Sequence, residues 1–251
     1  MVGQALAVVD NAFKNEKYAS NGKKRFGSNY PLPLFQKPIR RNQKVRDLFF
    51  KSGLVDASEQ LIGEGHVTLR ENMPDVSFNA QSELAAEEGM GLTEPFPSRK
   101  WQMQSGQGFY KGSGGDCNFM VGVALSDGQD VDENRGQFTV WPGSHVIIHP
   151  VLSQLVREDP PPDHLLKALR AKKIDVGSPK RILLKPGDAF IAHQRLASTQ
   201  GINLLKKVRK SVYFKIAHTD YDEMQDEFLE SKLPFTGFEP LQDIVADEFG
   251  G

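Results

Sequence analysis

The stretch from residue 182 to residue 217 constrains the fold of this chain more than any other. It opens with a short apolar run at 182–184, which the turn-forming triplet Pro-Gly-Asp at 186–188 closes. A second short apolar run covers 189–192, and a loop then leads to a longer segment at 208–217. Strands joined by such tight turns are typical of a small antiparallel barrel.

The segment 208–217 alternates strictly, so its residues sort onto two faces. Its apolar face carries Val212, Phe214 and Ile216. Its polar face carries Arg209, Ser211, Tyr213 and Lys215. A guanidinium on the inner face of a barrel is costly to bury unless it meets an anion, so Arg209 indicates an anion site. The alternative is that Arg209 faces water at a sheet edge.

Composition describes a soluble globular protein and excludes several classes. The chain has 251 residues, 39% of them hydrophobic and 25% charged, which suits one large all-β domain. Its 31 basic and 32 acidic residues leave a net charge of -1, which argues against a nucleic-acid partner. No apolar run reaches transmembrane length, and residues 1–10 lack the features of a signal peptide. The single cysteine, Cys117, excludes an internal disulfide and suits a cytoplasmic location.

Helices are expected mainly before the strands. The spacing predicts one helix over 5–13, a second that Asn42 caps, and a third that Asp56 caps and Gly63 ends. Strands begin near His66. Residues 73–98 show little periodicity and are interpreted as a lid or a mobile loop.

The middle of the chain alternates strands and helices. Strands are expected at 117–125 and 137–141, and helices at 150–157 and 162–172. If the first strand lines a cavity, one alternating set faces inward: Asn118, Met120 and Gly122. Gly122 would then leave room for a ligand.

Catalytic motifs are mostly missing from the sequence. It has no glycine-rich phosphate loop, no Gly-x-Ser-x-Gly elbow and no His-Glu-x-x-His. His145 and His149 are four residues apart, but a turn separates them, which disfavours a shared metal. The one His-x-Asp sequence is His218-Thr219-Asp220, which opens an acidic run interpreted as a solvated C-terminal segment.

Several ordered motifs resemble one known family. The run PGDAFIAHQRLASTQGINLLKKVRKSVYF resembles the C-terminal signature of the phytanoyl-CoA dioxygenase family, whose members are iron(II)- and 2-oxoglutarate-dependent oxygenases. The run VGVALSDGQDVDENRGQFTVWPGSHVIIHPVL resembles its central strands, and KWQMQSG resembles its Trp-His-x-Asp-Gly segment. The resemblance covers about residues 99–218. It implies a mainly β fold with flanking helices, a double-stranded β-helix of the jelly-roll or cupin-like kind.

The residues that match the family's iron ligands are substituted. The family binds iron through His-x-Asp and a distal His, a triad that leaves open positions for 2-oxoglutarate and oxygen. The matching positions here read Gln102, Gln104 and Ser198, whereas the position of the anion-binding arginine keeps Arg209. Asn203 and Ser211 also fit the family pattern.

These substitutions predict a barrel that binds no iron and binds 2-oxoglutarate weakly if at all, so no cofactor is expected. The pocket would be lined by Arg209, Ser211, Gln102, Gln104, Ser198, Asn118, Met120 and Asn203. Its partner would be a carboxylate or other polar small molecule, held by a binding protein or by a metal-independent isomerase, cyclase or lyase.

Two readings with iron remain open. One is an active dioxygenase with atypical ligands such as His193. The other is a shifted triad using His218 and Asp220, although this pair follows Arg209 whereas in the family it precedes the arginine. In either case the sequence predicts a single domain over 1–251, with helices in 1–65, the barrel in 66–218 and an extension in 219–251.

Overall fold

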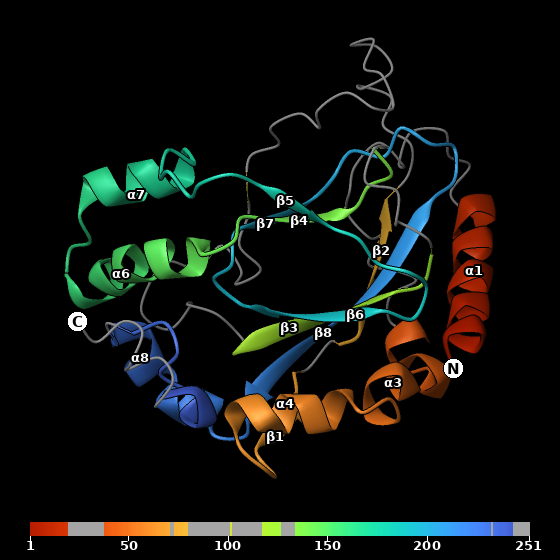
Figure 1. Ribbon diagram of the computed structural model, residues 1–251, viewed down its shortest axis with the longest axis horizontal. Helices are drawn as coiled ribbons and strands as arrows, with labels where there is room; N and C mark the ends of the chain where they lie inside the picture. The colour runs from red at the N-terminus through yellow and green to blue at the C-terminus, as the bar shows by residue number, and fades with distance from the viewer. Residues whose placement is uncertain are drawn as a thin grey trace.

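The computed structural model describes residues 1–19, 38–70, 73–79, 101, 117–126, 134–231 and 233–242. Within these ranges the chain forms two antiparallel sheets that face each other, with helices outside them (Figure 1). The predicted fold class, mainly β with flanking helices in a jelly-roll arrangement, is confirmed.

The larger sheet is built around strand β8 (Arg209–His218). Along one edge β8 pairs with β1 (Val67–Leu69) and then with β2 (Asp75–Asn79), which follow each other down the strand. Along its other edge β8 pairs with β3 (Phe119–Ala124), which in turn pairs with β6 (Ala189–His193). Every pairing is antiparallel, so β8 is the central strand of this sheet.

The smaller sheet has the order β5 (Lys180–Ile182), β4 (Phe138–Val140), β7 (Ser198–Gln200). Apolar side chains of both sheets meet between them. This inner cluster contains Met120, Phe138 and Val140, with Ile182, Phe190, Leu196 and Tyr213 packed against it. The space between the sheets is therefore filled at this level.

Three N-terminal helices cover the outer face of the larger sheet: α1 (Val2–Ala19), α3 (Gln43–Phe50) and α4 (Leu54–Ile62). Their apolar faces share one core with the outward side chains of β3 and β8. That core includes Val45, Leu48, Phe49, Ile62, Phe119, Val121, Val123, Val212, Phe214 and Ile216. The alternation predicted for β8 is thus present in the structure.

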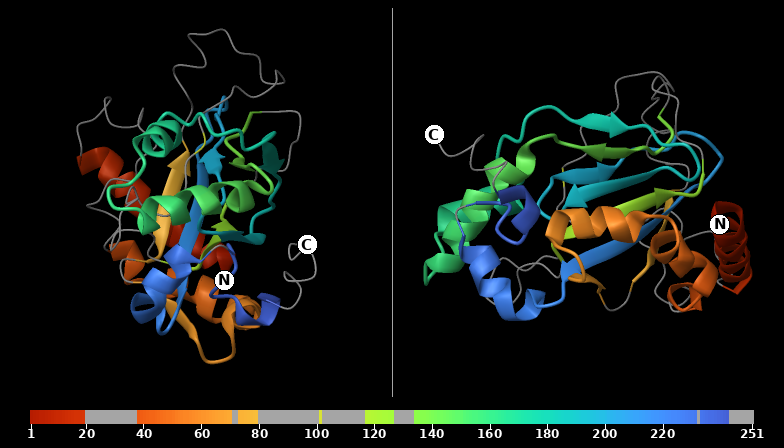
Figure 2. Two further views of the ribbon diagram at one scale, coloured as in Figure 1. Left: turned by 90° about the vertical axis from the view of Figure 1, so that its left-hand side faces the viewer. Right: turned by 60° about the horizontal axis from the view of Figure 1, so that its bottom comes forward.

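Three further helices lie at the opposite end of the molecule from α1 and α3: α6 (Ser144–Arg157), α7 (Asp163–Arg170) and α8 (Tyr221–Glu230) (Figure 2). A separate core joins α6 and α7 to Trp101 and Trp141. No helix within the described ranges combines the length and the apolar character needed to cross a membrane.

Local signals placed some helix ends well and others poorly. Asn42 caps α3 as predicted, since its Oδ1 accepts a hydrogen bond of 3.0 Å from the amide of Lys44. Helix α4 ends at Gly63 as predicted, but it begins after Gly53, so Asp56 lies in its first turn instead of capping it. Helix α6 begins at Ser144, directly after Gly143 with φ of 78°, and not at residue 150.

Two segments hold structure that the sequence pattern did not predict. Residues 75–79 form β2 inside the stretch interpreted as a lid or loop, and the remainder, 80–98, lies outside the described residues. The acidic run after His218 forms helix α8, whose Tyr221 and Phe228 are buried. An apolar stripe among the acids explains this helix.

Candidate functional site

The inward face of β8 forms a polar wall between the two sheets. Arg209 is 5% exposed and Ser211 is 8% exposed, and both are on the face opposite to Val212 and Phe214. Tyr213 follows on the same face and packs against the inner apolar cluster. The barrel interior is therefore polar at the Arg209 end of β8 and apolar beyond Tyr213.

Tyr213 connects this wall to neighbouring strands. Gln200 Nε2 donates to the phenolic oxygen of Tyr213 over 3.2 Å and also to Ser77 Oγ. Burial raises the pKa of Tyr213, while the nearby Arg209 guanidinium and hydrogen bonds from Ser211 and Gln200 act in the opposite direction. The phenol thus stays protonated at neutral pH and can donate its own hydrogen bond.

Arg209 also lines a small cavity at the start of β8. The cavity measures about 20 Å³, enough for one water molecule. Its lining residues are Ser126, Arg135, Asn203, Leu205, Lys207, Val208 and Arg209. Three of these carry positive charge, so the cavity has a local potential that favours anions.

Asn203 is engaged in holding the adjacent loop together. Its Nδ2 donates to the carbonyls of Asn79 over 2.8 Å and Lys207 over 2.9 Å, and its Oδ1 accepts from the amide of Leu205 over 3.0 Å. The side chain of Asn79 in turn donates to the carbonyl of Gly201, on the same loop as Asn203, over 2.8 Å. The amide of Asn203 therefore positions the cavity wall beside Arg209.

The other predicted pocket residues are distributed over several places. Met120 lies in the inner cluster, and Ser198 is buried in β7, paired with Val140. Asn118 directly precedes β3, and its Oδ1 accepts a 2.7 Å hydrogen bond from the amide of His218. Gln102 and Gln104 lie outside the described residues. Among the described residues the structure therefore brings Arg209, Ser211 and Asn203 together at one end.

The space expected beside Gly122 is occupied. A Cβ built on Gly122 would lie 2.3 Å from Cε1 of Phe190. The Phe190 ring stacks on Phe138 of the opposite sheet with 4.5 Å between centroids. Gly122 therefore makes room for Phe190 instead of a ligand, and the depth of any pocket at the Arg209 end is limited.

A pair of neighbouring histidines lies where the end of β6 meets the start of α6. The rings of His145 and His193 have centroids 5.3 Å apart, and Phe235 and Phe238 pack against His193. His193 Nε2 donates to the carbonyl of Pro234 over 2.8 Å, and its Nδ1 accepts from the amide of Arg195 over 3.0 Å. Both nitrogens are engaged, so His193 as placed is no metal ligand.

The environment of this pair keeps it neutral. His193 as a residue is partly exposed, but its ring is enclosed by Phe235 and Phe238. Burial, helped by the nearby His145, lowers the pKa of His193 to about 3, although the hydrogen bond to Pro234 opposes this. Burial also lowers the pKa of His145.

A second pair of histidines lies near the surface, where β1 begins and β8 ends. The rings of His66 and His218 stack with 4.4 Å between centroids and 12° between planes. Asp220 joins them, and one ligand atom from each of the three residues lies within 4.8 Å of the others. The sequence showed His218-x-Asp220, but His66 is distant along the chain and only the pairing of β1 with β8 reveals it.

Comparisons with known proteins reveal likeness in fold only. No family model matches the chain, and no curated protein matches it. Among solved structures, the non-heme monooxygenase ThoJ in complex with nickel matches with 14% identity and a TM-score of 0.49, over 87% of this chain and 71% of that one. HygX from Streptomyces hygroscopicus with nickel and 2-oxoglutarate bound matches with 13% identity and a TM-score of 0.47, over 86% and 79%.

Three other solved structures are also similar to the chain. SnoK, a non-heme α-ketoglutarate-dependent carbocyclase from nogalamycin biosynthesis, matches with 14% identity and a TM-score of 0.47, over 86% of this chain and 76% of that one. The chain spans 44% of the length of EvdMO1 and 57% of the epimerase SnoN, which it also matches. SnoK and SnoN are thus α-ketoglutarate-dependent enzymes, and HygX holds bound 2-oxoglutarate.

The expectation of a chain without cofactors is wrong. Among the described residues His66, His218 and Asp220 form a group whose ligand atoms lie close enough together to hold a metal ion. The error has a physical origin. The sequence offered His218 and Asp220 as a possible pair of ligands, but it could not place His66 beside them.

Proposed function

We propose that the chain binds a small carboxylate-bearing molecule between its sheets, at the Arg209 end of β8. The observation that carries this proposal is the position of Arg209, buried on an inward polar wall and lining a cavity with Arg135 and Lys207. A desolvated guanidinium offers a fork of donors that fits a carboxylate. Such a charge-assisted contact contributes about 1.5–3 kcal/mol.

The neighbouring groups support a carboxylate or a similarly polar ligand. Ser211 and Tyr213 follow Arg209 on the same face, and both carry hydroxyl groups that can donate. The raised pKa of Tyr213 keeps its phenol protonated. Polar groups of this kind orient a ligand while Arg209 provides the charge.

The filled interior limits the size of the ligand. Met120, Phe138 and Phe190 close the space between the sheets beyond Tyr213. A ligand would therefore enter at the Arg209 end and place only one polar group deeply. Small dicarboxylates meet this requirement.

Calorimetric titration with 2-oxoglutarate, the carboxylate held in the HygX structure, and with succinate tests the proposal. Succinamide, which lacks charge, is the matched ligand control. We expect Arg209→Gln to weaken carboxylate binding by at least about tenfold, a loss of about 1.4 kcal/mol, because it removes the buried charge.

Lys206→Gln provides the matched protein control. Lys206 is exposed, belongs to the same loop and does not line the cavity, so this variant removes one positive charge elsewhere. We expect its affinity to stay within about twofold of the wild type. Equal losses in both variants, or succinamide binding as tightly as succinate, would contradict the proposal. Thermal melting of both variants checks that they fold.

A further inference from the structure

The paired backbones of β1 and β8 bring His66, His218 and Asp220 together. Val67 is the register partner of His218, and the amide of Thr219 donates to the carbonyl of His66 over 2.9 Å. Sheet pairing therefore fixes the backbone of His66 beside the His218-Thr219-Asp220 segment. The backbone pairing thus holds the three side chains close together in the folded protein.

The nitrogen and oxygen atoms of the three side chains that could bind a metal ion lie slightly too far apart to do so as placed. A small movement would bring them within coordination distance. His218 Nδ1 lies 3.9 Å from Asp220 Oδ2 and accepts a 3.1 Å hydrogen bond from the Asp220 amide. His66 Nδ1 contacts Thr219 Oγ1 over 3.3 Å. Two ligand atoms of one metal ion are typically about 3 Å apart when each is about 2.1 Å from it.

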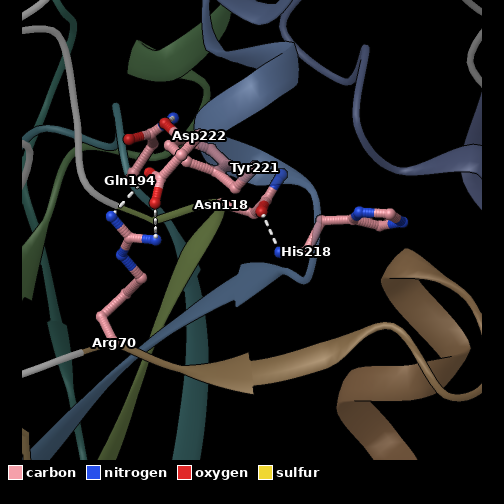
Figure 3. Close-up of polar contacts among 6 residues, drawn as sticks. All are labelled: Arg70, Asn118, Gln194, His218, Tyr221 and Asp222. Carbon is pink, nitrogen blue, oxygen red and sulfur yellow. Dashed lines mark hydrogen bonds and ion pairs between the residues drawn. The ribbon is translucent and has the colours of Figure 1, made fainter.

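The two imidazole rings are stacked, so their nitrogen lone pairs point in parallel directions. The rings must therefore turn before both lone pairs can point at one metal ion. His66 and Asp220 are exposed, so their side chains can turn toward His218, whose side chain is 12% exposed. In Figure 3 the imidazole of His218 points away from Asn118 and Tyr221, and it stacks on the ring of His66. The rearrangement is therefore mainly a change of rotamer in the two exposed residues.

We infer that His66, His218 and Asp220 form a binding site for a divalent transition metal ion. Two imidazoles and one carboxylate suit Zn²⁺, Ni²⁺ or Co²⁺, whereas Mg²⁺ and Ca²⁺ prefer oxygen ligands alone. Three protein ligands leave further coordination positions to water. Cys117, the one cysteine of the chain, is buried and does not belong to the cluster.

This site is separate from the carboxylate site proposed above. His218 belongs to the outward alternating set of β8, with Val212, Phe214 and Ile216, whereas Arg209 belongs to the inward set at the other end of the strand. The metal would join the turn after α4 to the junction between β8 and α8. Nearby, an ion pair ties the residue after β1 to α8, since Arg70 donates to Asp222 over 2.7 and 3.0 Å (Figure 3).

Titration of the tag-free, metal-stripped full chain with Co²⁺ and Zn²⁺ tests the inference. We expect one ion of Zn²⁺ per chain by calorimetry, and a visible Co²⁺ absorption band that Zn²⁺ abolishes. His66→Ala and Asp220→Asn change exposed side chains and should each weaken binding by more than about tenfold. Both ions should raise the melting temperature of the wild type and not of these variants.

His164→Ala is the matched control, because His164 is an exposed histidine of α7 outside the cluster. We expect it to bind Zn²⁺ as the wild type does. No saturable binding in the wild type, or equal binding in His66→Ala and the wild type, would overturn the inference. Neither outcome bears on carboxylate binding, which Arg209→Gln tests independently.

Discussion

The molecule contains two pairs of neighbouring histidines with opposite surroundings. His145 and His193 are enclosed by Phe235 and Phe238, and both nitrogens of His193 are hydrogen-bonded to backbone. His66 and His218 stack near the surface, beside Asp220. One side-chain type thus serves as neutral packing material in one place and as a potential cation ligand in the other. The difference lies in enclosure and in the presence of a carboxylate.

The largest effect should come from removing the buried ring. We expect His193→Ala to lower the free energy of unfolding by about 3 kcal/mol, because it leaves a cavity and two unpaired backbone groups. Those groups are the carbonyl of Pro234 and the amide of Arg195. Urea denaturation measures the change, with His66→Ala as the exposed counterpart. If both variants lost a similar free energy of unfolding, the two histidine pairs would not differ in their contribution to stability.

The second-largest effect should be a loss of stability in acid, caused by the enclosed pair. The folded-state pKa of His193 is about 3, below its value in an unfolded chain, so the unfolded state takes up the proton first. Stability should therefore fall as pH drops below about 6.5, by about 1.4 kcal/mol per pH unit, or about 2.7 kcal/mol at pH of about 4.5. The lowered pKa of His145 acts in the same direction.

Urea denaturation across this pH range measures the slope, and His193→Gln is the informative variant because it keeps polarity without the titrating ring. Its slope should be clearly smaller than that of the wild type. If wild type and variant lose stability in parallel, His193 does not carry the acid sensitivity.

The smallest effect should come from the exposed pair without metal. Asp220→Asn should change the free energy of unfolding by less than about 0.5 kcal/mol, because surface ion pairs contribute little. Asp220 is 56% exposed, lies 3.9 Å from His218 Nδ1 and makes no capping hydrogen bond to α8. Denaturation in the presence of a chelator tests this. If the free energy of unfolding fell by more than about 1 kcal/mol, the exposed pair would also contribute to the stability of the fold.

Patterns of short range predicted much of the fold. Alternation in β8 separated Arg209 and Ser211 from Val212 and Phe214 correctly, because successive side chains of a strand point to opposite faces of the sheet. The cap at Asn42 was also predicted, since its hydrogen bond lies within two residues. Such signals need no knowledge of distant parts of the chain.

Features that depend on distant contacts were missed. Strand β2 looks irregular in sequence and is stabilised by pairing with β8. The space beside Gly122 belongs to Phe190, which arrives from β6. His66 meets His218 only because β1 pairs with the end of β8. No local pattern encodes which distant side chain occupies a given place, so the site inside the barrel was predicted less well than the strands.

The central position of β8 also has a consequence for how the chain acquires its structure. Strands β1 and β2 both pair with β8, although more than a hundred residues separate them from it in the sequence. Neither has another strand partner among the described residues. During synthesis from the N-terminus, these two strands must therefore wait until residues 209–218 have left the ribosome. Such high contact order predicts slow folding, with the exposed edges of early strands open to misassociation until β8 arrives.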